Sequence, residues 1–476
     1  MISWRLHEFA HIAGVQAPGE DRAFASVCTD TRKLEPGALF VALRGPNFDG
    51  HDFVASAARQ GAAGALVARP IPVDVPQLVA PDPLAALAVF ARAWRRQFDI
   101  PLIAVTGSNG KTTTKELIGA ILSRRGAGLV TRGNLNNHIG VPLTLLELRP
   151  SHRWAVVEMG ASGPGEIAHL AQIAEPTIGL VTNAGAAHLE GFGNLQGVAN
   201  GKGELFRALP SQGVAVINAD DAFAAQWRDA CSAGRILSFG FEQPADFMAH
   251  KVRSGGDASG FHVEFELAAP EGKRPATLAL GGLHNLRNAL GAAAAASAAG
   301  ASLEQIVAGL AEARAVAGRL ELKPALNGAF LVDDSYNANP SSLKAGLDAF
   351  ASLGGRRWLV LGDMLELGAG VDELHAEVGR YARQAGIERL LTVGRHSPAA
   401  VAAFGPGGQS YESVDALVAE ARRALEPGVA VLIKGSRANR LERVSAALGR
   451  TADAAAEDVG PRGAATRQPA DRNDSP

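Results

Sequence analysis

A glycine-rich run, AVTGSNGKTTT at residues 104–114, combines the residue types that bind the phosphates of a nucleotide. Gly107 and Gly110 allow the backbone to turn its N–H groups toward phosphate oxygens, and the dipole of a following helix adds to that attraction. Lys111 supplies a positive charge for the terminal phosphates, and Thr112 supplies a hydroxyl for Mg²⁺. The predicted phosphate-binding residues are Gly107, Ser108, Asn109, Gly110, Lys111, Thr112 and Thr113.

The run departs from the general P-loop pattern GxxxxGK[ST], because Val105 stands where the first glycine is expected. The alternative is a glycine turn that happens to precede a lysine-capped helix. Nucleotide binding is favoured because the run follows an apolar strand at 102–105 and opens a helix at 111–124, which is the context that a P-loop requires. The loop alone is equally compatible with a GTPase, a kinase or an ATPase motor.

Two further polar residues stand at or just after predicted strands. Glu158 ends the apolar run 154–157, and His188 lies shortly after the run 178–181. Both would lie at the sheet edge that carries the phosphate-binding loop, where the Glu158 carboxylate could reach a metal held by Thr112. The alternatives are a surface glutamate in a loop and a structural histidine held by hydrogen bonds.

These side chains need a scaffold of buried parallel strands. From Pro101 onward, apolar runs alternate with helical segments, a rhythm typical of a parallel sheet that helices cover on both faces. The stretch 261–280 instead alternates polar and apolar residues, as an antiparallel appendage would, and an alanine-rich helix at 285–299 closes this domain. The predicted strands of the parallel sheet are 102–105, 154–157, 178–181 and 214–217.

The chain as a whole is predicted to be an α/β protein of three domains and a tail. The domains span residues 1–98, 99–318 and 319–450, and the third repeats the strand and helix rhythm of a small Rossmann-like domain. The tail, 451–476, has hardly any large apolar residue and is predicted to be disordered. Elements predicted in the outer domains are a strand at 38–42, helices at 55–60 and 83–98, and strands at 330–332, 358–361, 390–393 and 429–433.

Bulk composition excludes several classes of protein. With 476 residues the chain is too long for one core, and 46 basic against 48 acidic residues leave no positive field for nucleic acid. Cys28 and Cys231 lack CxxC spacing, which fits a reducing cytoplasm. The first 14 residues do not form a secretory signal, and the uncharged stretch 289–303 is too short to cross a bilayer. We expect a cytoplasmic monomer without a membrane anchor.

The run TGSNGKTTTKE, 106–116, resembles the shortened P-loop of the Mur ligases and folylpolyglutamate synthetases. The resemblance continues in order along the chain and covers everything except the tail, so the chain is identified as a member of the Mur ligase family. DTR and FDGHDF are similar to the UDP-holding N-terminal domain, which folylpolyglutamate synthetases lack. The matching runs are DTR (30–32), FDGHDF (48–53), GNLNN (133–137), EMGAS (158–162), TNAGAAH (182–188), KGE (202–204), LHN (283–285), GR (318–319), DDSYNANP (333–340), GDMLELG (362–368) and KGSR (434–437).

The resemblance implies a three-domain architecture with a central P-loop ATPase-type parallel sheet. It also implies an ATP-dependent ligase that uses Mg²⁺ and an acyl phosphate. The runs DDSYNANPSS, GDMLELG and KGSR resemble the branch that joins D-alanyl-D-alanine to UDP-N-acetylmuramoyl-tripeptide in peptidoglycan precursor synthesis. The sibling branch that adds the third residue typically shows Asp-Tyr-Ala-His where this chain has Asp-Ser-Tyr-Asn. A sibling ligase and a non-catalytic nucleotide-binding partner remain the alternatives.

The resemblance also assigns roles to residues that the nucleotide and its metal would contact. Lys111, Glu158, His188 and Lys202 are the implied catalytic residues, and the last three join Thr112 as metal ligands. By itself Lys202 reads as a solvated lysine, but the family lysine carries a carbamate, which requires a neutral amine and hence a lowered pKa. Asn285 resembles the adenine-reading residue, although a helix cap is the alternative. Arg319 and Asp333 resemble the γ-phosphate arginine and the ribose aspartate, and closure near Gly318 would bring them to ATP.

Substrate residues follow from the same resemblance. The candidates for D-alanyl-D-alanine lie at strand ends of the third domain, and Lys434 is proposed to hold the dipeptide carboxylate. Arg32 could equally be a surface ion-pair partner, and Asn339-Pro340 could be a turn signal. Whether lysine or diaminopimelate is the third residue of the tripeptide is left open. The candidates are Thr31, Arg32, His51, Asn136, Asn137 and Ser162 for the UDP-sugar peptide, and Asn337, Asn339, Lys434 and Ser436 for the dipeptide.

Overall fold

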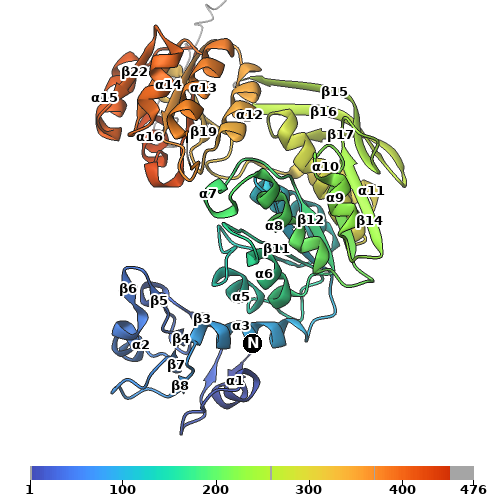
Figure 1. The fold of residues 1–476 in the computed structure, drawn as a ribbon, viewed down its shortest axis with the longest axis vertical. Coiled ribbons are helices and arrows are strands. Elements are labelled where there is room, and N and C mark those ends of the chain that lie inside the picture. The colour runs from blue at the N-terminus through green and yellow to red at the C-terminus, as the bar shows by residue number, and fades with distance from the viewer. Residues whose placement is uncertain (1–2, 258–259, 369, 451–476) are drawn as a thin grey trace, which may run out of the picture.

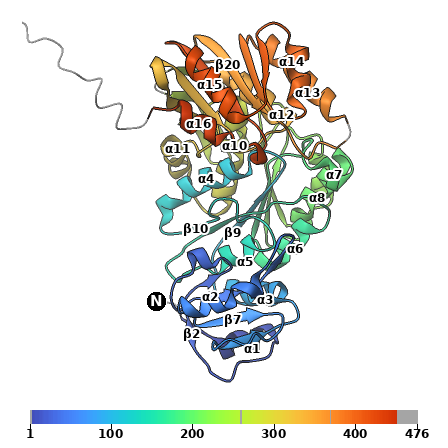
Figure 2. The ribbon, with the colours of Figure 1, turned by 90° about the vertical axis from the view of Figure 1, so that its left-hand side faces the viewer.

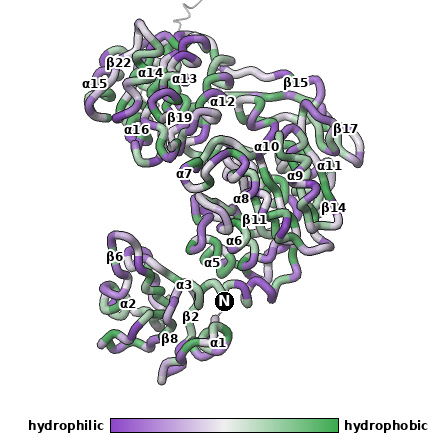
Figure 3. The backbone as a smooth tube through the Cα atoms, in the orientation of Figure 1, coloured by the Kyte–Doolittle hydropathy of each residue, from purple (hydrophilic) through white to green (hydrophobic). Residues whose placement is uncertain are grey.

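The computed structural model describes residues 3–257, 260–368 and 370–450, and the predicted tail 451–476 lies outside them. The chain forms three lobes in sequence order, with the central lobe between the other two (Figures 1 and 2). Hydrophobic segments gather inside each lobe and hydrophilic ones lie along its outer helices and loops (Figure 3). Within the described ranges, no helix is long and apolar enough to cross a membrane. The domain limits given above remain predictions.

The N-terminal lobe is built on a small parallel sheet of strand order β3-β4-β7-β8. The strand expected at 38–42 is β4, and the helix expected at 55–60 is α2. Two short antiparallel pairs, β1 with β2 and β5 with β6, complete the described strands of this lobe. Its elements are β1 (Trp4–Arg5), α1 (Leu6–Ala13), β2 (Ala23–Phe24), β3 (Val27–Cys28), β4 (Leu39–Val41), β5 (Arg44–Gly45), β6 (Phe48–Asp49), α2 (Val54–Arg59), β7 (Gly64–Val67) and β8 (Gln77–Val79).

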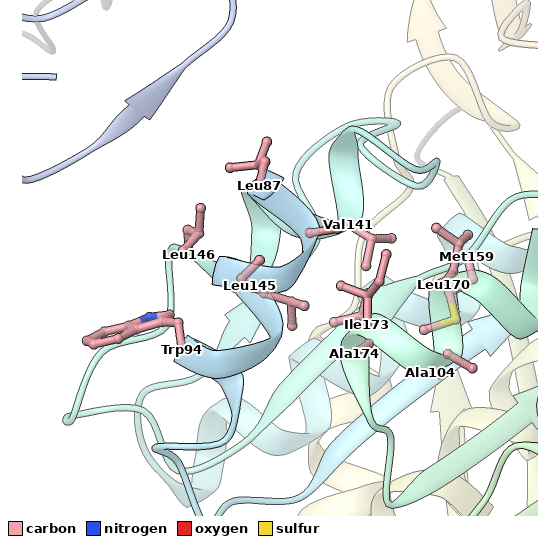
Figure 4. Close-up of a cluster of buried hydrophobic side chains, with 14 of the residues drawn as sticks. Leu87, Trp94, Ala104, Val141, Leu145, Leu146, Met159, Leu170, Ile173 and Ala174 are labelled. Carbon is pink, nitrogen blue, oxygen red and sulfur yellow. The ribbon is translucent and has the colours of Figure 1, made fainter. Parts of the chain in front are cut away.

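Helix α3 (Pro83–Arg95) joins the N-terminal lobe to the central one. It begins at Asp82, whose side chain accepts the N–H groups of Leu84 and Ala85. The ring of Trp94 packs edge-on against Trp4 at 4.9 Å, on the N-terminal side. The same helix lies against α5 (Gly140–Leu145) and α6 (Glu166–Ala174) of the central lobe, as Figure 4 shows. One continuous cluster of buried residues therefore spans both lobes.

The central sheet has the order β10-β11-β9-β12-β13-β14-β15-β16-β17, parallel up to β15 and antiparallel beyond it. The four predicted parallel strands are β9, β11, β12 and β13. The stretch expected as an appendage is β16 and β17, which continue the main sheet through β15. Its elements are β9 (Leu102–Thr106), α4 (Lys111–Leu122), β10 (Leu129–Val130), β11 (Ala155–Glu158), β12 (Ile178–Val181), α7 (Leu189–Phe192), α8 (Leu195–Arg207), β13 (Val214–Asn218), α9 (Ala224–Asp229), β14 (Arg235–Gly240), β15 (Phe247–Asp257), β16 (Gly260–Ala269), β17 (Gly272–Leu278), α10 (Leu283–Ala298) and α11 (Leu303–Glu312).

Strand register fixes the position of the site. Strand β9 lies between β11 and β12, and in these pairs Val105 stands opposite Glu158 while Thr106 stands opposite Val181. The phosphate-binding loop that follows β9 is therefore flanked by Glu158 on one side and by the segment 182–188 on the other. Helix α10 covers the sheet beside α4, and the alanines at 292–296 are fully buried, which allows close packing of the two helices.

The C-terminal lobe carries a sheet of order β18-β19-β23-β20-β21-β22, in which only the β18 pairing is antiparallel among the described strands. The predicted strands are β19, β20, β21 and β23, whereas the edge strands β18 and β22 were not predicted. Phe261, on β16 of the central sheet, is buried in the core of this lobe. Its elements are β18 (Glu321–Pro324), β19 (Phe330–Asp334), α12 (Pro340–Ala351), β20 (Arg356–Gly362), α13 (Val371–Gln384), β21 (Arg389–Val393), α14 (Ser397–Phe404), β22 (Gly408–Tyr411), α15 (Val414–Ala424), β23 (Val429–Lys434) and α16 (Glu442–Leu448).

Candidate active site between the central and C-terminal lobes

A cleft of about 710 Å³ lies where the central and C-terminal lobes meet. Most of the residues predicted to bind nucleotide, metal or substrate line it. Gly107, Lys202 and Ser436 lie outside the lining, as do Asp333 and the three candidates of the N-terminal lobe. The predicted residues in the lining are Ser108, Asn109, Gly110, Lys111, Thr112, Thr113, Asn136, Asn137, Glu158, Ser162, His188, Asn285, Arg319, Asn337, Asn339 and Lys434.

The two loop glycines are required by space as well as by conformation. Gly107 has φ +140° and Gly110 has φ +82°. A Cβ atom on Gly107 would lie 2.0 Å from Thr182 Oγ1, and one on Gly110 would lie 2.3 Å from Asn288 Oδ1. The segment after β12 and helix α10 therefore approach the loop so closely that only glycine fits at these two positions.

We expect Gly107→Ala to weaken ADP binding about tenfold or more, because a strained backbone of this kind costs about 1–3 kcal/mol and the loop must also move away from Thr182. Calorimetric titration with ADP measures the effect. Gly14→Ala is the matched control, since Gly14 also has positive φ but a Cβ there meets nothing within 4 Å. Unchanged ADP affinity in Gly107→Ala would contradict this account of the loop.

The segment after β12 braces the loop through hydrogen bonds. The amide N–H of Ser108 donates to the carbonyl of Asn183 at 3.0 Å, and the amide N–H of Asn109 donates to Asn183 Oδ1 at 3.0 Å. Thr182 Oγ1 and Asn183 Nδ2 both donate to the carbonyl of Asn109, at 2.6 and 3.0 Å. The loop is thus held in shape before any ligand arrives.

Lys111 and Thr112 have protein partners in this structure. Lys111 Nζ donates to the carbonyl oxygens of Gly107 at 2.7 Å and Ser108 at 3.3 Å, so the ammonium lies over the loop. Desolvation lowers the pKa of Lys111, and nearby Glu158 opposes that shift. Thr112 Oγ1 accepts a hydrogen bond of 3.0 Å from Arg319 Nη2. A bound phosphate would therefore take the place of the two carbonyl oxygens as the partner of the Lys111 ammonium.

Arg319 connects the two lobes beside the linker. Its guanidinium stacks on the ring of Tyr336 at 4.3 Å, and its Nε is buried without a hydrogen-bond partner among the described residues. Gly318, next to it, has φ +72°, and Leu320 has φ +49°. A stacked arginine with a spare buried donor is suited to an anionic ligand. The left-handed backbones of Gly318 and Leu320, on either side of Arg319, mark the place where the linker turns.

Glu158 has the environment of a metal ligand. Its side chain is 2% exposed, Asn136 Nδ2 donates to Oε1 at 2.7 Å, and Oε2 has no hydrogen-bond partner within the described part of the chain. The ammonium of Lys115 lies 3.6 Å from Oε2. A buried carboxylate oxygen without a hydrogen bond is costly unless a cation completes it. Glu158 and the Thr112 hydroxyl are the hard oxygen donors that Mg²⁺ prefers.

His188 lines the cleft from the start of α7, and its backbone adopts φ +54°. Its Nδ1 lies 2.6 Å from Oε2 of Glu366, which belongs to the C-terminal lobe. Desolvation lowers the pKa of His188, while Glu366 opposes the shift. Within the described ranges, no three His, Cys, Asp or Glu side chains form a ready metal cluster. The candidate ligands therefore need a further donor to hold a cation.

Lys202 does not line the cleft itself but contacts Ala161, which does. Its side chain is buried on α8, and Nζ donates to the carbonyl of Ala161 at 3.1 Å and lies 5.0 Å from the centre of the Phe192 ring. In the described residues no carboxylate comes within ion-pair distance of it. Burial, together with the charge of Lys111, lowers the pKa of Lys202 to about 7. A large share of this amine is therefore neutral near physiological pH.

The adenine candidate Asn285 is buried at the N-terminal end of α10. Its Nδ2 donates to the carbonyl of Gly281 at 2.8 Å, and its Oδ1 accepts from Asn288 at 3.2 Å. Next to it, desolvation lowers the pKa of His284 to about 4, so this imidazole is neutral. Asn285 thus makes hydrogen bonds to the turn before its helix and to the next turn of the helix, and it lines the cleft.

The two aspartates at the end of β19 point to opposite sides. Asp333 faces a second cleft of about 540 Å³ and is held by Lys323, Ser335 and Ser445. Asp334 lines the main cleft instead. Neighbouring residues of a strand face opposite sides of the sheet, so Asp334 and not Asp333 lines the main cleft in this arrangement, and the ribose role of Asp333 remains a prediction. The sequence run alone did not show which side faces the central lobe.

Three dipeptide candidates contact one another or the phosphate-binding loop. Lys434 Nζ forms an ion pair of 2.5 Å with Asp334 and donates to the carbonyl of Asn337 at 3.1 Å. Burial raises the pKa of Asp334, although Lys434 opposes the shift. Asn339 Nδ2 donates to Asn109 Oδ1 at 2.8 Å. The charge of Lys434 is therefore already paired, and a dipeptide carboxylate would compete with Asp334.

The remaining candidates are placed as follows. His51 is buried in the N-terminal lobe, with Nδ1 2.5 Å from Asp49 Oδ1 and Nε2 accepting from the N–H of Ala68, so neither ring nitrogen is open to a ligand. Arg32 is 87% exposed and pairs with Asp30, as its surface alternative predicted, and Thr31 is in the same turn. Their substrate roles remain predictions.

Several cleft residues were not predicted as site residues. They come from segments after β12 and β13, from α10 and from the end of β19. Asp220 and Asp221, which follow β13, lie in a loop without a recognisable motif. Asn183 and His284 lie inside the runs TNAGAAH and LHN that resemble the Mur ligases, so those runs could have indicated them. Arg287 and Asn288 lie two and three residues after Asn285 on the same helix, so the position of Asn285 could have indicated them. The unpredicted residues in the lining include Asn183, Asp220, Asp221, His284, Arg287, Asn288 and Asp334.

Comparisons with known proteins agree with this arrangement. Three family profiles match: Mur ligase family, catalytic domain (23–95), Mur ligase middle domain (105–296), and Mur ligase, glutamate ligase domain (318–437). The chain is 43% identical over 451 residues to UDP-N-acetylmuramoyl-tripeptide--D-alanyl-D-alanine ligase of Escherichia coli K12, covering 94% of this chain and 99% of that protein. The protein of that name from Mycobacterium tuberculosis H37Rv is 36% identical over 94% and 98% of the two chains.

Solved structures give the same result. MurF from Acinetobacter baumannii superposes with a TM-score of 0.86 at 35% identity, covering 94% of this chain and 98% of that one. MurF ligase from Thermotoga maritima in complex with ADP superposes with a TM-score of 0.76 at 26% identity, covering 89% and 96%. The similarity extends over all three lobes and the cleft between the last two.

Proposed function

Since the chain belongs to the Mur ligase family, we propose that it joins D-alanyl-D-alanine to UDP-N-acetylmuramoyl-tripeptide with ATP, giving the pentapeptide, ADP and phosphate. The relatives that carry this name match along nearly their whole length. The observation that carries the proposal is the cleft itself, where the phosphate-binding loop, the buried oxygen of Glu158 and the DDSYNANP segment meet. The similarity to an ADP complex supports ATP as the nucleotide.

The first chemical step brings two anions together. The terminal carboxylate of the tripeptide attacks the γ-phosphorus of ATP, which releases ADP and leaves an acyl phosphate. Lys111 and the N-terminus of α4 neutralise the phosphates, and Arg319 supplies a second cation from the C-terminal lobe. The braced loop fixes the phosphates in position, so little reorganisation is needed.

The second step forms the amide bond. The amine of D-alanyl-D-alanine attacks the acyl carbon, the tetrahedral intermediate collapses, and phosphate leaves. Asn337, Asn339 and Lys434 lie on the same cleft and are the proposed dipeptide contacts, with Asp334 next to them. Contacts of the C-terminal lobe with Asn109 and Thr112 keep this segment over the loop, which limits access of water to an acyl phosphate.

Mg²⁺ fits the donor set of the cleft, since Thr112 offers a hydroxyl, Glu158 a buried oxygen without a hydrogen bond, and His188 an imidazole. When bound, the ion would offset the negative charge of the phosphates. Lys202 is the proposed fourth contributor. Its neutral amine can add to carbon dioxide and release one N–H proton to solvent, which forms a carbamate and places a negative group where the lysine would otherwise carry a positive charge.

The assay that tests this function measures phosphate release from ATP with the UDP-muramoyl tripeptide and D-alanyl-D-alanine, together and singly, using lysine and diaminopimelate tripeptides in turn. We expect release only when both substrates are present, with a mass gain equal to one dipeptide minus water. Release with a single amino acid in place of the dipeptide would move the chain to a sibling activity. Binding of ATP without release under any combination would support the non-catalytic alternative.

A further inference from the structure

Glu366 makes a contact across the lobes that the reaction scheme above does not use. Its Oε2 lies 2.6 Å from Nδ1 of His188, which is on the central lobe. His188 lines the cleft, whereas Glu366 contacts the ring from outside the cleft lining. In this arrangement Nδ1 lies within ion-pair distance of the carboxylate without a well-aligned hydrogen bond, and Nε2 is the ring nitrogen left for a ligand of the cleft.

The loop that carries Glu366 is held on both sides of this residue. The N–H of Leu365 donates to Ser436 Oγ at 2.8 Å, and the N–H of Met364 donates to His375 Nε2 at 3.0 Å. Leu367 is buried in the core of the C-terminal lobe. Glu366 itself has φ +62°, a conformation that non-glycine residues rarely adopt. The loop thus presents this one side chain outward from an anchored backbone.

The pair is a poor candidate for a purely stabilising contact. The side chains of His188 and Glu366 are 30% and 61% exposed, and ion pairs with such exposure contribute little to stability. Both partners have left-handed backbones, which adds a conformational cost on each side. A geometric role accounts for these features better than a stabilising one does.

We propose that Glu366 is a positioning residue for the metal centre: it fixes the His188 ring from the C-terminal lobe so that Nε2 faces the cation. A carboxylate that accepts the other N–H of a ligating histidine orients the ring and sets its tautomer, and a small rotation of either side chain would align the 2.6 Å contact for such a bond. The central lobe alone would then hold a looser metal site, and docking of the C-terminal lobe would complete it. The inference rests on the proposed function, because that function places a cation beside His188.

The test uses Mn²⁺ as a paramagnetic substitute in the full-length protein with saturating ADP and bicarbonate. Titration followed by electron paramagnetic resonance gives the Mn²⁺ affinity, and pulsed measurements detect nitrogen coupled to the ion. In Glu366→Ala we expect about 10–100-fold weaker Mn²⁺ binding and a reduced nitrogen coupling, as for other partners of ligating histidines. Glu366→Gln keeps an acceptor oxygen and should stay within a few-fold of wild type.

Two controls separate positioning from a general effect. Glu373→Ala removes an exposed carboxylate of the same lobe that pairs with Arg380, and it should leave Mn²⁺ binding unchanged. In a His188→Ala background, Glu366→Ala should have no further effect, because the two residues act as one unit. Metal-free ADP binding should be equal in all variants.

Wild-type affinity and wild-type nitrogen coupling in Glu366→Ala would overturn the inference while leaving the proposed function intact. Absence of nitrogen coupling in the wild-type protein would also overturn it, since His188 would then not be a ligand. The proposed function falls separately, if the ligation assay with both substrates releases no phosphate.

Discussion

Replacement of Lys111 by alanine is expected to lower the kcat of ligation by about 10³–10⁵-fold, comparable to the loss of an arginine that stabilises the same transferring phosphoryl charge. The ammonium of Lys111 lies 2.7 Å from the carbonyl of Gly107 and lines the cleft with Arg319. Arg319 cannot replace it, because Arg319 reaches the loop from the other lobe through Thr112. Phosphate release at saturating substrates measures the effect.

The matched control is Lys273→Ala, which removes an exposed lysine of β17 far from the loop residues and should keep wild-type kcat. Thermal unfolding should show that Lys111→Ala is folded, since the hydrogen bonds of this side chain go to carbonyl groups of its own loop. Lys111→Arg should not restore activity, because a planar guanidinium does not fit where a compact ammonium lies. A kcat within tenfold of wild type in Lys111→Ala would refute the role.

Replacement of Lys202 by alanine is the second large effect, and we expect at least about a 10³-fold loss of kcat, equivalent to roughly 4 kcal/mol of lost metal-assisted stabilisation. Unlike Lys111→Ala, this variant should be partly rescued by acetate or propionate, since a short acid can occupy the place of the carbamate. The same acids should not rescue Lys111→Ala, in which a cation is missing. Lys202→Arg should remain inactive, because arginine keeps its charge and forms no carbamate.

The pH dependence of carbamate formation follows from the position of the Lys202 pKa. Burial lowers this pKa to about 7, so the ammonium predominates below pH 7 and the reactive neutral amine predominates above it. Protein depleted of carbon dioxide should therefore regain activity faster at pH 8 than at pH 6 when dissolved carbon dioxide is held constant. If bicarbonate removal leaves the wild type unaffected and no acid rescues Lys202→Ala, the carbamate proposal is wrong.

Local sequence determined much of the site. The glycines at 107 and 110 predicted the loop from their spacing between a strand and a helix, and their positive φ angles and close neighbours show why no side chain fits there. The alternation of apolar strands and helices predicted the parallel central sheet, and β9, β11 and β12 follow the predicted strands within a residue or two. Because parallel strands end at one edge, Glu158 and the segment before His188 could be placed beside the loop from the sequence.

The identity of the partners across the lobes was decided by tertiary structure. Asp333 and Asp334 are adjacent in sequence, and only the orientation of β19 against the central lobe shows that Asp334 reaches the cleft. The edge strands β18 and β22 were missed because half-exposed strands carry a weak apolar pattern.

Long-range contacts explain the remaining differences. The sequence places Glu366 178 positions after His188, a separation over which no local pattern can report a contact. The lowered pKa of Lys202 likewise depends on burial beneath Ala161 and Phe192, whereas the lysine itself looks like any other on a charged helix. Spacing and residue type therefore determined which chemistry is present, and packing between distant segments determined which atoms can perform it.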